Sequence, residues 1–467
     1  MTRDGSVQAI EAYLETHCGS LDGCSPYSDE VLDGFLELGP LHYFIPPSLG
    51  GRRTGAESYL NIVETTAYYS LPLGLTLGIT GSLFLMPFLK HATPDLLARV
   101  IPDFLNGPAL GGIMITEPTG GTDVFGLRTT IAQGDGSMTL TGRKCWGGLT
   151  GKAEHWLVAG RVVRGDRLTR SLKLLYVPRS SPGISVATTF DALGLQPIPY
   201  GETAFDDVEV PDAHNLTPKG TSVLRVMYDT LFRSRLGIAA IASGLCKRLS
   251  EEVDARAAKR VVFGGPIDRF DQVQYRLSSI RGLAQMNHCL LRFTAEWMDR
   301  HEDVSGHYVL VNAVKVVASD SMAAAADSAT QLFASAAYKR NHLVGRAYVD
   351  SRPFQIFEGS NDVLHDNTFE IVAGKYGSVN SDAISQELET YGLRLPEDLP
   401  EGILAALSAA KESPQREQVQ YGKIIEWIVV LAVVDHIHAK ENAPVEDARR
   451  VASFHLAARL AELPYLG

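Results

Sequence analysis

Residues 352–364 read Arg352-Pro-Phe-Gln-Ile-Phe-Glu358-Gly-Ser-Asn-Asp-Val-Leu364, with the Glu358 carboxylate set after aromatic and aliphatic residues and before Gly-Ser-Asn. A carboxylate in such a setting is expected to be partly desolvated, and desolvation raises its pKa toward neutrality. A general base that removes a weakly acidic proton near neutral pH needs a pKa of this kind. Taken alone, the pattern is more typical of a solvated or capping Glu at a helix start, so its meaning depends on the rest of the chain.

The size and composition of the chain favour a soluble multidomain protein. Its 467 residues predict two to four domains, and its contents of 45% hydrophobic and 21% charged residues are ordinary for a globular protein. The net charge of −11 argues against a nucleic-acid partner, because no broad face would neutralise phosphates.

The cysteines predict a reducing compartment. They are Cys18, Cys24, Cys145, Cys246 and Cys289. An odd number of widely spaced cysteines without a C-x-x-C pair fits neither a disulfide framework nor a zinc site. We therefore expect a cytoplasmic protein without a metal centre.

One uncharged segment is long enough on paper to cross a bilayer. Residues 65–89 carry no charge, and Leu71–Leu89 is strongly apolar. The segment is interrupted by Pro72, Gly74, Gly78, Gly81 and Pro87. Its flanks also do not follow the charge rule of membrane spans. We expect a buried helix here, and the shorter apolar run Ile424–Val434 predicts a core helix.

Periodicity divides the chain into four regions and predicts an α+β multidomain fold. Residues 1–111 form an expected α-helical domain, with helices over Val7–His17, Asp29–Leu38, Ala56–Ser70 and Pro94–Leu105. Residues 112–220 form an expected β-barrel or β-sandwich domain. Its predicted strands are Ser137–Gly142, after the turn at 134–136, and His155–Val163, Ser171–Val177, Gly183–Thr189 and Glu202–Val210.

The remaining residues predict helices. Residues 221–376 form an expected antiparallel bundle, with helices over Ser222–Val262, Arg269–Glu302, Ser305–Lys339 and Pro353–Gly374. After a Ser/Asn/Pro-rich stretch, residues 377–467 form an appended extension that is expected to be helical over Glu401–Leu466.

Five short motifs in this order resemble the acyl-CoA dehydrogenase family. They are residues 113–126 (IMITEPTGGTDVFG), 142–146 (GRKCW), 205–211 (FDDVEVP), 260–264 (RVVFG) and 357–362 (FEGSND). Together they span about residues 30–375. The last motif is most similar to the very-long-chain branch, which also has a C-terminal helical extension.

The resemblance implies an oxidoreductase of fatty acid metabolism that uses FAD to dehydrogenate an acyl thioester, on coenzyme A or on a carrier protein. Glu358 would abstract the α-proton, and the flavin N5 would accept the β-hydride. The implied cofactor contacts are Thr116, Thr122, Trp146, Arg260, Phe263, Gln331, Ser360 and Asp362. The implied substrate contacts are Arg235, Phe357 and Gly359. Arg260 and Phe263 would reach the flavin of a neighbouring subunit, which implies a homodimer or homotetramer.

Plain structural roles compete with several of these assignments. Thr116 and Thr122 also fit turn hydroxyls, and Trp146 fits a core tryptophan. Arg260 and Arg235 fit solvated helix arginines. The Leu71–Leu89 run fits a wall of an acyl tunnel or plain core packing.

Three positions depart from the family pattern. Gly148 stands where a Thr usually touches the flavin edge, with Thr150 two positions late. The family's glycine turn after Gln331 is replaced by Ala334-Ser-Ala-Ala337, which is expected to crowd the cofactor or to continue the helix. Asp271 replaces a Gln and would repel a pyrophosphate, unless the register shifts to Gln272 or Gln274.

Two other functions therefore stay open. One is a flavin oxidase or monooxygenase on the same fold. The other is a cofactor-free binding or assembly subunit, which the altered turn and Asp271 favour. An electron-transfer flavoprotein or another acceptor is the expected redox partner of the dehydrogenase.

Overall fold

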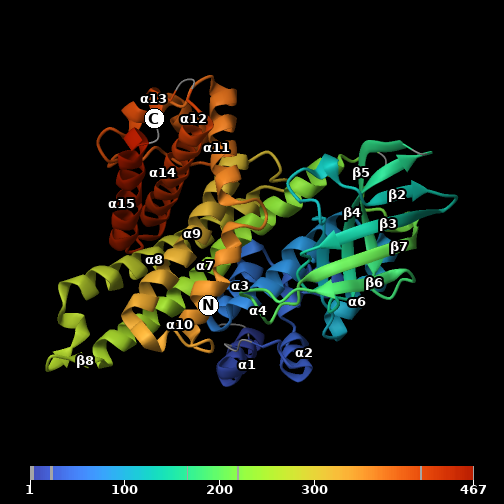
Figure 1. Cartoon of the computed structure of the whole chain (residues 1–467), viewed down its shortest axis with the longest axis horizontal. Helices are drawn as coiled ribbons and strands as arrows, with labels where there is room; N and C mark the ends of the chain where they lie inside the picture. Colours follow the sequence, from blue (N-terminus) through green and yellow to red (C-terminus); the bar gives the residue numbers. More distant parts are fainter. Residues whose placement is uncertain (1–4, 22–24, 166, 218–219, 411–412, 466–467) are drawn as a thin grey trace. The chain divides into compact units, whose positions relative to one another are not determined.

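The computed structural model describes residues 5–21, 25–165, 167–217, 220–410 and 413–465 (Figure 1). By its contacts the chain divides into two compact units. The first contains residues 1–66 and 72–234, and the second contains residues 67–71 and 235–467. A helical segment, a β segment and a second helical segment follow one another along the chain, which confirms the predicted fold class.

The N-terminal helices lie close to their predicted ranges. They are α1 (Gly5–Leu21), α2 (Asp29–Glu37), α3 (Ala56–Tyr69) and α6 (Pro94–Asn106), with short 3₁₀ turns at Pro40–Phe44 and Pro47–Leu49. Ser28 caps α2 and Thr93 caps α6, each by accepting a backbone N–H of the first turn.

The uncharged run forms a buried helix, as predicted, but with an irregular centre. It consists of α4 (Leu71–Gly78), a π-helical segment η3 (Ile79–Leu85) and α5 (Met86–His91). By length and composition, Leu71–His91 and Tyr308–Ala336 could each cross a membrane, but 83% of each apolar window is buried inside the described structure. A Cβ on Gly81 would stand 2.1 Å from the Phe44 ring, so glycine permits this packing.

The β-domain is one mixed sheet in the described part of the chain. Its strands are β1 (Gly111–Met114), β2 (Thr130–Gln133), β3 (Ser137–Cys145), β4 (His155–Arg164), β5 (Arg167–Pro178), β6 (Ile184–Thr189) and β7 (Gly201–Pro211). The order is β1-β4-β2-β3-β7-β6, and β5 also pairs with β4. The first half of β4 runs parallel to β1 and the second half parallel to β2. The short strands β1 and β2 were not predicted, because four residues give little alternation.

The second unit is built from long helices (Figure 1). They are α7 (Val223–Lys259), which begins in the first unit, α8 (Asp271–Arg300), α9 (Tyr308–Phe333), α10 (Leu343–Asp350) and α11 (Asn361–Tyr376). The strands β8 (Val261–Val262) and β9 (Gly265–Pro266) form a small hairpin between α7 and α8. Short 3₁₀ turns lie at Ile267–Arg269, Ala334–Ala336 and Arg352–Gln355.

Two predicted helix ranges in this unit are wrong. Pro353–Gly374 is not one helix, because residues 356–360 separate the 3₁₀ turn at Arg352–Gln355 from α11. Glu358 has φ +56° and Gly359 has φ +99°, values that an α-helix excludes. The helix predicted over Ser305–Lys339 ends at Phe333, because Ala334 has φ +53°. The helix α10 was not predicted.

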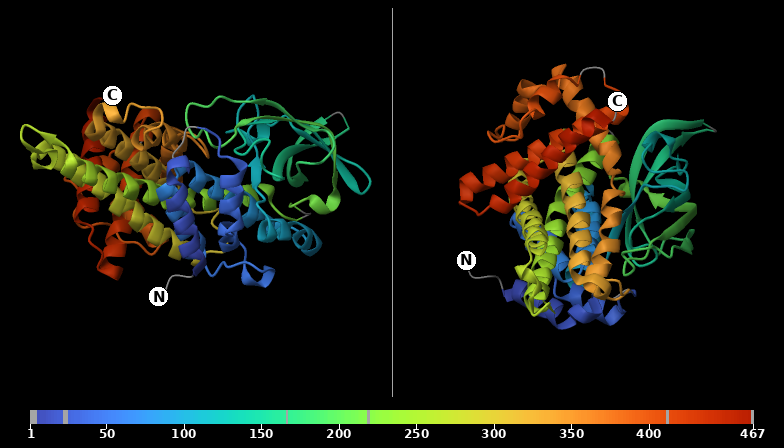
Figure 2. Two further views of the ribbon diagram at one scale, coloured as in Figure 1. Left: turned by 90° about the horizontal axis from the view of Figure 1, so that it is seen from below. Right: turned by 60° about the vertical axis from the view of Figure 1, so that its left-hand side comes forward.

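The extension is helical, as predicted, and packs on the bundle. It contains α12 (Ser381–Glu389), which was not predicted, and α13 (Ile403–Ser408), α14 (Gln415–Glu441) and α15 (Glu446–Glu462). A 3₁₀ turn at Leu463–Tyr465 follows α15. Figure 2 shows α14 and α15 against the long helices, where α14 contacts α9 and α11 and α15 contacts α8. Every residue of Ile424–Val434 is buried, which confirms the predicted core helix.

Candidate functional site

Glu358 lies in a short non-helical loop, residues 356–360, directly before α11. We call this segment the Glu358 loop. Phe354 is fully buried beneath it and packs on Phe357, with ring centroids 4.8 Å apart. The Oε2 atom of Glu358 is buried, although the residue as a whole is partly exposed. A positive φ at a non-glycine residue stores strain, and such strain clusters at functional sites.

Two buried cations hold the backbone of the Glu358 loop. Arg235 donates from Nε to the Glu358 carbonyl oxygen at 2.8 Å. Lys315 donates from Nζ to the Gly359 carbonyl oxygen at 2.8 Å and to Asn361 Oδ1 at 2.7 Å. Hydrogen bonds to charged donors are stronger than neutral ones. The loop is therefore fixed from α7 and α9 in a conformation it would not adopt alone.

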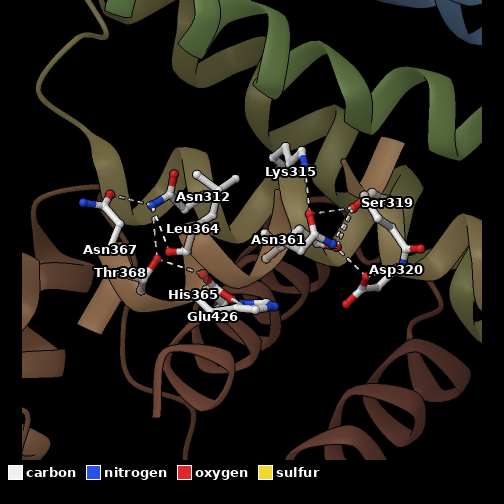
Figure 3. A network of polar contacts seen from close by, with 12 residues as sticks. Asn312, Lys315, Ser319, Asp320, Asn361, Leu364, His365, Asn367, Thr368 and Glu426 are labelled. Atoms are coloured by element: carbon white, nitrogen blue, oxygen red, sulfur yellow. Dashed lines mark hydrogen bonds and ion pairs between the residues drawn. The ribbon is translucent and has the colours of Figure 1, made fainter. Parts of the chain in front are cut away.

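Asn361 connects the start of α11 to α9. Its Nδ2 donates to Asp320 Oδ1 at 2.8 Å and to Ser319 Oγ at 3.1 Å (Figure 3). Gln355 also donates to Asp320 Oδ1, at 2.6 Å, from the other side of the loop. The two residues that flank the Glu358 loop are thus bound to the same aspartate.

Lys315 is a functional residue that the sequence analysis missed. Burial lowers its pKa to about 7, and the nearby Glu358 carboxylate opposes that shift. The ammonium is thus close enough to the carboxylate for the two charges to interact. A lone lysine in the apolar run 309–318 was the signal that could have revealed it.

The predicted substrate residues lie around the same loop. Arg235 is 9% exposed, which excludes the solvated helix arginine as its structural role. A Cβ on Gly359 would stand 3.0 Å from Leu364 and 3.1 Å from the Arg235 guanidinium. Its positive φ and these neighbours together require glycine. Phe357 is partly exposed beside it.

In the first unit, a buried ion pair joins the first two sequence motifs. Lys144 donates from Nζ to Glu117 Oε1 at 2.8 Å and to the Ile115 carbonyl oxygen at 2.9 Å. Glu117 also accepts the backbone N–H groups of Arg128 and Thr129. Burial opposes ionisation, but these hydrogen bonds hold the pKa of Glu117 below its ordinary value. The pair, which the sequence analysis missed, fixes the loop that carries Thr116 and Thr122.

Trp146 is 56% exposed, which excludes the core tryptophan as its role. Its backbone has φ +59°, and its ring lies 4.6 Å from that of Phe190. Thr116 is partly buried and its carbonyl accepts the Cys145 N–H, whereas Thr122 is exposed. An exposed aromatic surface with a neighbouring threonine loop is suited to a planar ligand.

Thr150 does not take the place of the missing threonine beside Trp146. Its hydroxyl donates to the Gly147 carbonyl oxygen at 2.6 Å, and its N–H donates to the Pro199 carbonyl oxygen. A Cβ on Gly148 would stand 2.6 Å from Ile79 Cδ1, so the packing on this side favours glycine.

The remaining predicted cofactor residues of the second unit are exposed, except Ser360, which is partly buried. Phe263, with φ +50°, is 88% exposed at the turn of the β8–β9 hairpin, and Arg260 precedes that hairpin. Gln331 is exposed on the last turn of α9, and Asp362 is exposed on the first turn of α11. Ser360 is the N-cap residue of α11, and its carbonyl accepts the Leu364 N–H. The surface-arginine role for Arg260 remains compatible with this placement.

The altered glycine turn keeps a glycine-like backbone. Ala334 has φ +53° and ψ −136°, a combination that costs an L-residue energy. The expectation that alanine would continue the helix is therefore wrong. Asp271 opens α8 and is exposed, as are Gln272 and Gln274.

Comparisons with known proteins agree with this architecture. The chain matches the models of the acyl-CoA dehydrogenase N-terminal domain over residues 1–108, the middle domain over 112–208 and the C-terminal domain over 224–372. The mouse mitochondrial very long-chain specific acyl-CoA dehydrogenase is 27% identical over 349 residues, 73% of this chain and 53% of the relative. The chain thus aligns with about half the length of that relative.

Solved structures share the fold. Butyryl-CoA dehydrogenase from Megasphaera elsdenii has a TM-score of 0.71 at 23% identity and covers 80% of this chain and 99% of its own. The prolyl acyl carrier protein oxidase AnaB has a TM-score of 0.71 at 17% identity and covers 80% and 100%. Residues after 372, which include α12 to α15, lie beyond the matched C-terminal model.

Proposed function

Because the chain belongs to the acyl-CoA dehydrogenase family, we propose that it catalyses the FAD-dependent α,β-dehydrogenation of an acyl thioester. Glu358 is the base that removes the α-proton in this proposal. The observation that carries it is the buried support of the Glu358 loop, in which Arg235 and Lys315 fix consecutive carbonyl groups.

The residues of the chain fit the cofactor that the family uses. The exposed ring of Trp146 offers a face for the isoalloxazine, and the loop with Thr116 and Thr122 offers hydroxyl and backbone donors. Arg260, Phe263 and Gln331 are exposed and available to the cofactor of a second copy. Ser360 and Asp362, at the start of α11, complete the set of proposed cofactor contacts. When bound, FAD supplies the hydride acceptor for the β-hydrogen.

The chain's own residues perform the proton chemistry. The carboxylate of Glu358 accepts the α-proton of the thioester, and a positioned base typically contributes about 10²–10⁴-fold in rate. Lys315 and Arg235 do not take this proton, since both donate to backbone carbonyl groups. Lys315 lies close enough to the Glu358 carboxylate for the two groups to interact electrostatically.

The proposal includes an acyl group on coenzyme A or on a carrier protein, an electron-transfer flavoprotein or another acceptor, and a homo-oligomer in the cytoplasm. The relatives support both carriers, because their names include very long-chain acyl-CoA and prolyl acyl carrier protein enzymes.

A cofactor-free subunit is the second candidate, favoured by Asp271 in place of the family's glutamine. The test is to purify the protein, record its flavin absorbance and titrate it anaerobically with saturated acyl thioesters of both carriers. We expect a yellow protein that one class of thioester bleaches. A colourless protein that FAD does not reconstitute would contradict the dehydrogenase. Rapid reoxidation of the bleached protein by oxygen would favour an oxidase.

A further inference from the structure

The helix α14 of the extension carries a fully buried carboxylate, Glu426, with 0% exposure. It lies in the apolar stretch Ile424–Val434, where an ionised group is costly unless hydrogen bonds satisfy it. Both of its oxygens have partners on α11. Oε1 accepts from Thr368 Oγ1 at 2.8 Å, and Oε2 pairs with His365 Nδ1 (Figure 3).

The contacts continue from Glu426 to the Glu358 loop. Thr368 Oγ1 accepts from Asn312 Nδ2 at 3.2 Å, and Asn312 Oδ1 accepts from an Arg235 terminal nitrogen at 3.3 Å. Arg235 then donates from Nε to the Glu358 carbonyl oxygen at 2.8 Å. Hydrogen bonds in series therefore join the extension, α11, α9 and α7 to the backbone of the proposed base.

The direction of these hydrogen bonds is set by the carboxylate. An ionised Glu426 only accepts, so the single hydroxyl proton of Thr368 points to it. The hydroxyl oxygen is then left to accept from Asn312 Nδ2. The Asn312 nitrogen also faces Leu364 O at 3.4 Å and Asn367 Oδ1 at 3.1 Å. With its nitrogen on this side, the amide presents its oxygen to Arg235.

Close backbone packing fixes the register of the extension. A Cβ on Gly422, one turn before Glu426, would stand 1.9 Å from the His365 carbonyl oxygen. A Cβ on Gly282 of α8 would stand 2.5 Å from the Asp447 carbonyl oxygen of α15. Because each contact tolerates only glycine, α14 cannot slide along α11, and α15 cannot slide along α8, without a clash. Glu426 is thereby held opposite His365 and Thr368.

We propose that Glu426 is a positioning residue for the base, acting through Thr368, Asn312 and Arg235 on the Glu358 loop. The C-terminal extension then helps to position the proposed base, in addition to packing on the helix bundle. This inference rests on the proposed function of Glu358. Glu426 itself touches neither substrate nor cofactor in this account.

The test compares Glu426→Gln and Thr368→Val with Glu387→Gln in the flavin-loaded chain of residues 1–467. Glu387 is a matched control, because it is a buried carboxylate of α12 whose partners are Lys375, Tyr376 and Tyr391. Single-turnover flavin reduction by a thioester gives a saturating rate and an apparent affinity. Thr368→Val is nearly isosteric, so it keeps the test valid if Glu426→Gln does not fold.

We expect the saturating rate to fall about tenfold in Glu426→Gln and in Thr368→Val, with unchanged thioester affinity and an unchanged rate in Glu387→Gln. The double variant Glu426→Gln/Thr368→Val should lose no more than the larger single loss, because both changes interrupt one series. Rates equal to wild type in both variants, or losses that multiply in the double variant, would overturn the inference while the proposed function stands. A wild-type protein that no thioester bleaches would overturn both.

Discussion

The Glu358 loop and the β8–β9 hairpin belong to the same helical unit, and both contain a non-glycine residue with positive φ. The Glu358 loop is fixed by buried charges, since Arg235 and Lys315 donate to its carbonyl groups. The hairpin is held at its surface, where Arg269 donates to the carbonyl groups of Val262 and Phe263. The Phe263 ring is almost fully exposed.

This difference separates two kinds of functional segment. The Glu358 loop has its support within the chain, so its geometry is set before any ligand binds. The hairpin leaves an aromatic ring and a nearby arginine exposed to solvent. Such exposure is typical of a segment that forms a site only together with another molecule. Loss of a buried charge should therefore damage the loop far more than a surface change damages the hairpin.

Among changes to the residues that support the two segments, the largest expected effect comes from Lys315→Met. The change removes the hydrogen bonds of Lys315 Nζ to the Gly359 carbonyl oxygen and to Asn361 Oδ1, and with them the support that α9 gives this loop. A displaced base can lose about a hundredfold in rate, so we expect the rate of flavin reduction to fall by about that factor. Stopped-flow reduction measures it, with the exposed Lys247→Met on α7 as the control. A rate within twofold of wild type would remove the distinction between the two segments.

The second effect is the pH dependence of stability. Burial lowers the pKa of Lys315 to about 7 in the folded state, against 10.5 as its ordinary value. Between these values the unfolded chain binds the extra proton, so this lysine makes the free energy of unfolding rise with pH, by at most about 1.4 kcal/mol per pH unit. Below pH 7 Lys315 is protonated in both the folded and the unfolded chain. Its contribution to the free energy of unfolding is then constant and is at its most destabilising value.

Denaturant unfolding of wild type and Lys315→Met across this pH range isolates the contribution. We expect the difference in unfolding free energy between the two proteins to shift in favour of wild type as pH rises from 7 to about 10.5. Parallel curves would show that Lys315 is not desolvated as described.

A third change tests the surface next to the β8–β9 hairpin. Asp271→Gln removes a negative charge at the exposed start of α8 and restores the residue expected from the family resemblance. If a pyrophosphate lies near this position, FAD affinity should rise about tenfold, a gain of ~1.4 kcal/mol. Fluorescence titration of the apoprotein measures the dissociation constant, with Asp268→Asn as a neighbouring control. An unchanged affinity would place the cofactor away from Asp271.

The smallest effect concerns the turn after α9. Ala334→Gly removes the cost of φ +53° at a residue with a Cβ, and the gain exceeds the extra chain entropy of glycine. We expect the free energy of unfolding to rise by about 1 kcal/mol. Ala336→Gly, in the same 3₁₀ turn, should lower it instead. Denaturant unfolding midpoints of both variants, compared with that of wild type, measure these two changes.

The sequence predicted the order of domains and most helices, because periodicity and five local motifs are legible in a single chain. It did not predict the break at residues 356–360, because a positive φ at Glu358 depends on partners from other helices. Lys315 lies 43 residues before Glu358, and Arg235 lies 123 residues before it. Only the fold brings these two cations to one loop, and no local pattern reports such a contact.

The proposed role of Glu426 could not be predicted for the same reason. Its position in an apolar run predicted a core helix, and the structure confirms that helix. Which residues of α11 it contacts depends on the close approach at Gly422, a tertiary feature. The resemblance supplied the proposed role of Glu358, whereas the structure supplied the residues that hold it in place.

The central claim is that Glu358 is the base, and Glu358→Gln tests it most directly. The amide keeps the shape of the side chain but cannot accept the α-proton. In an anaerobic titration with a thioester that bleaches wild type, we expect the variant to keep its flavin absorbance, with reduction slowed by at least about 10²-fold. A flavin-bound variant that the thioester bleaches at the wild-type rate would contradict the account.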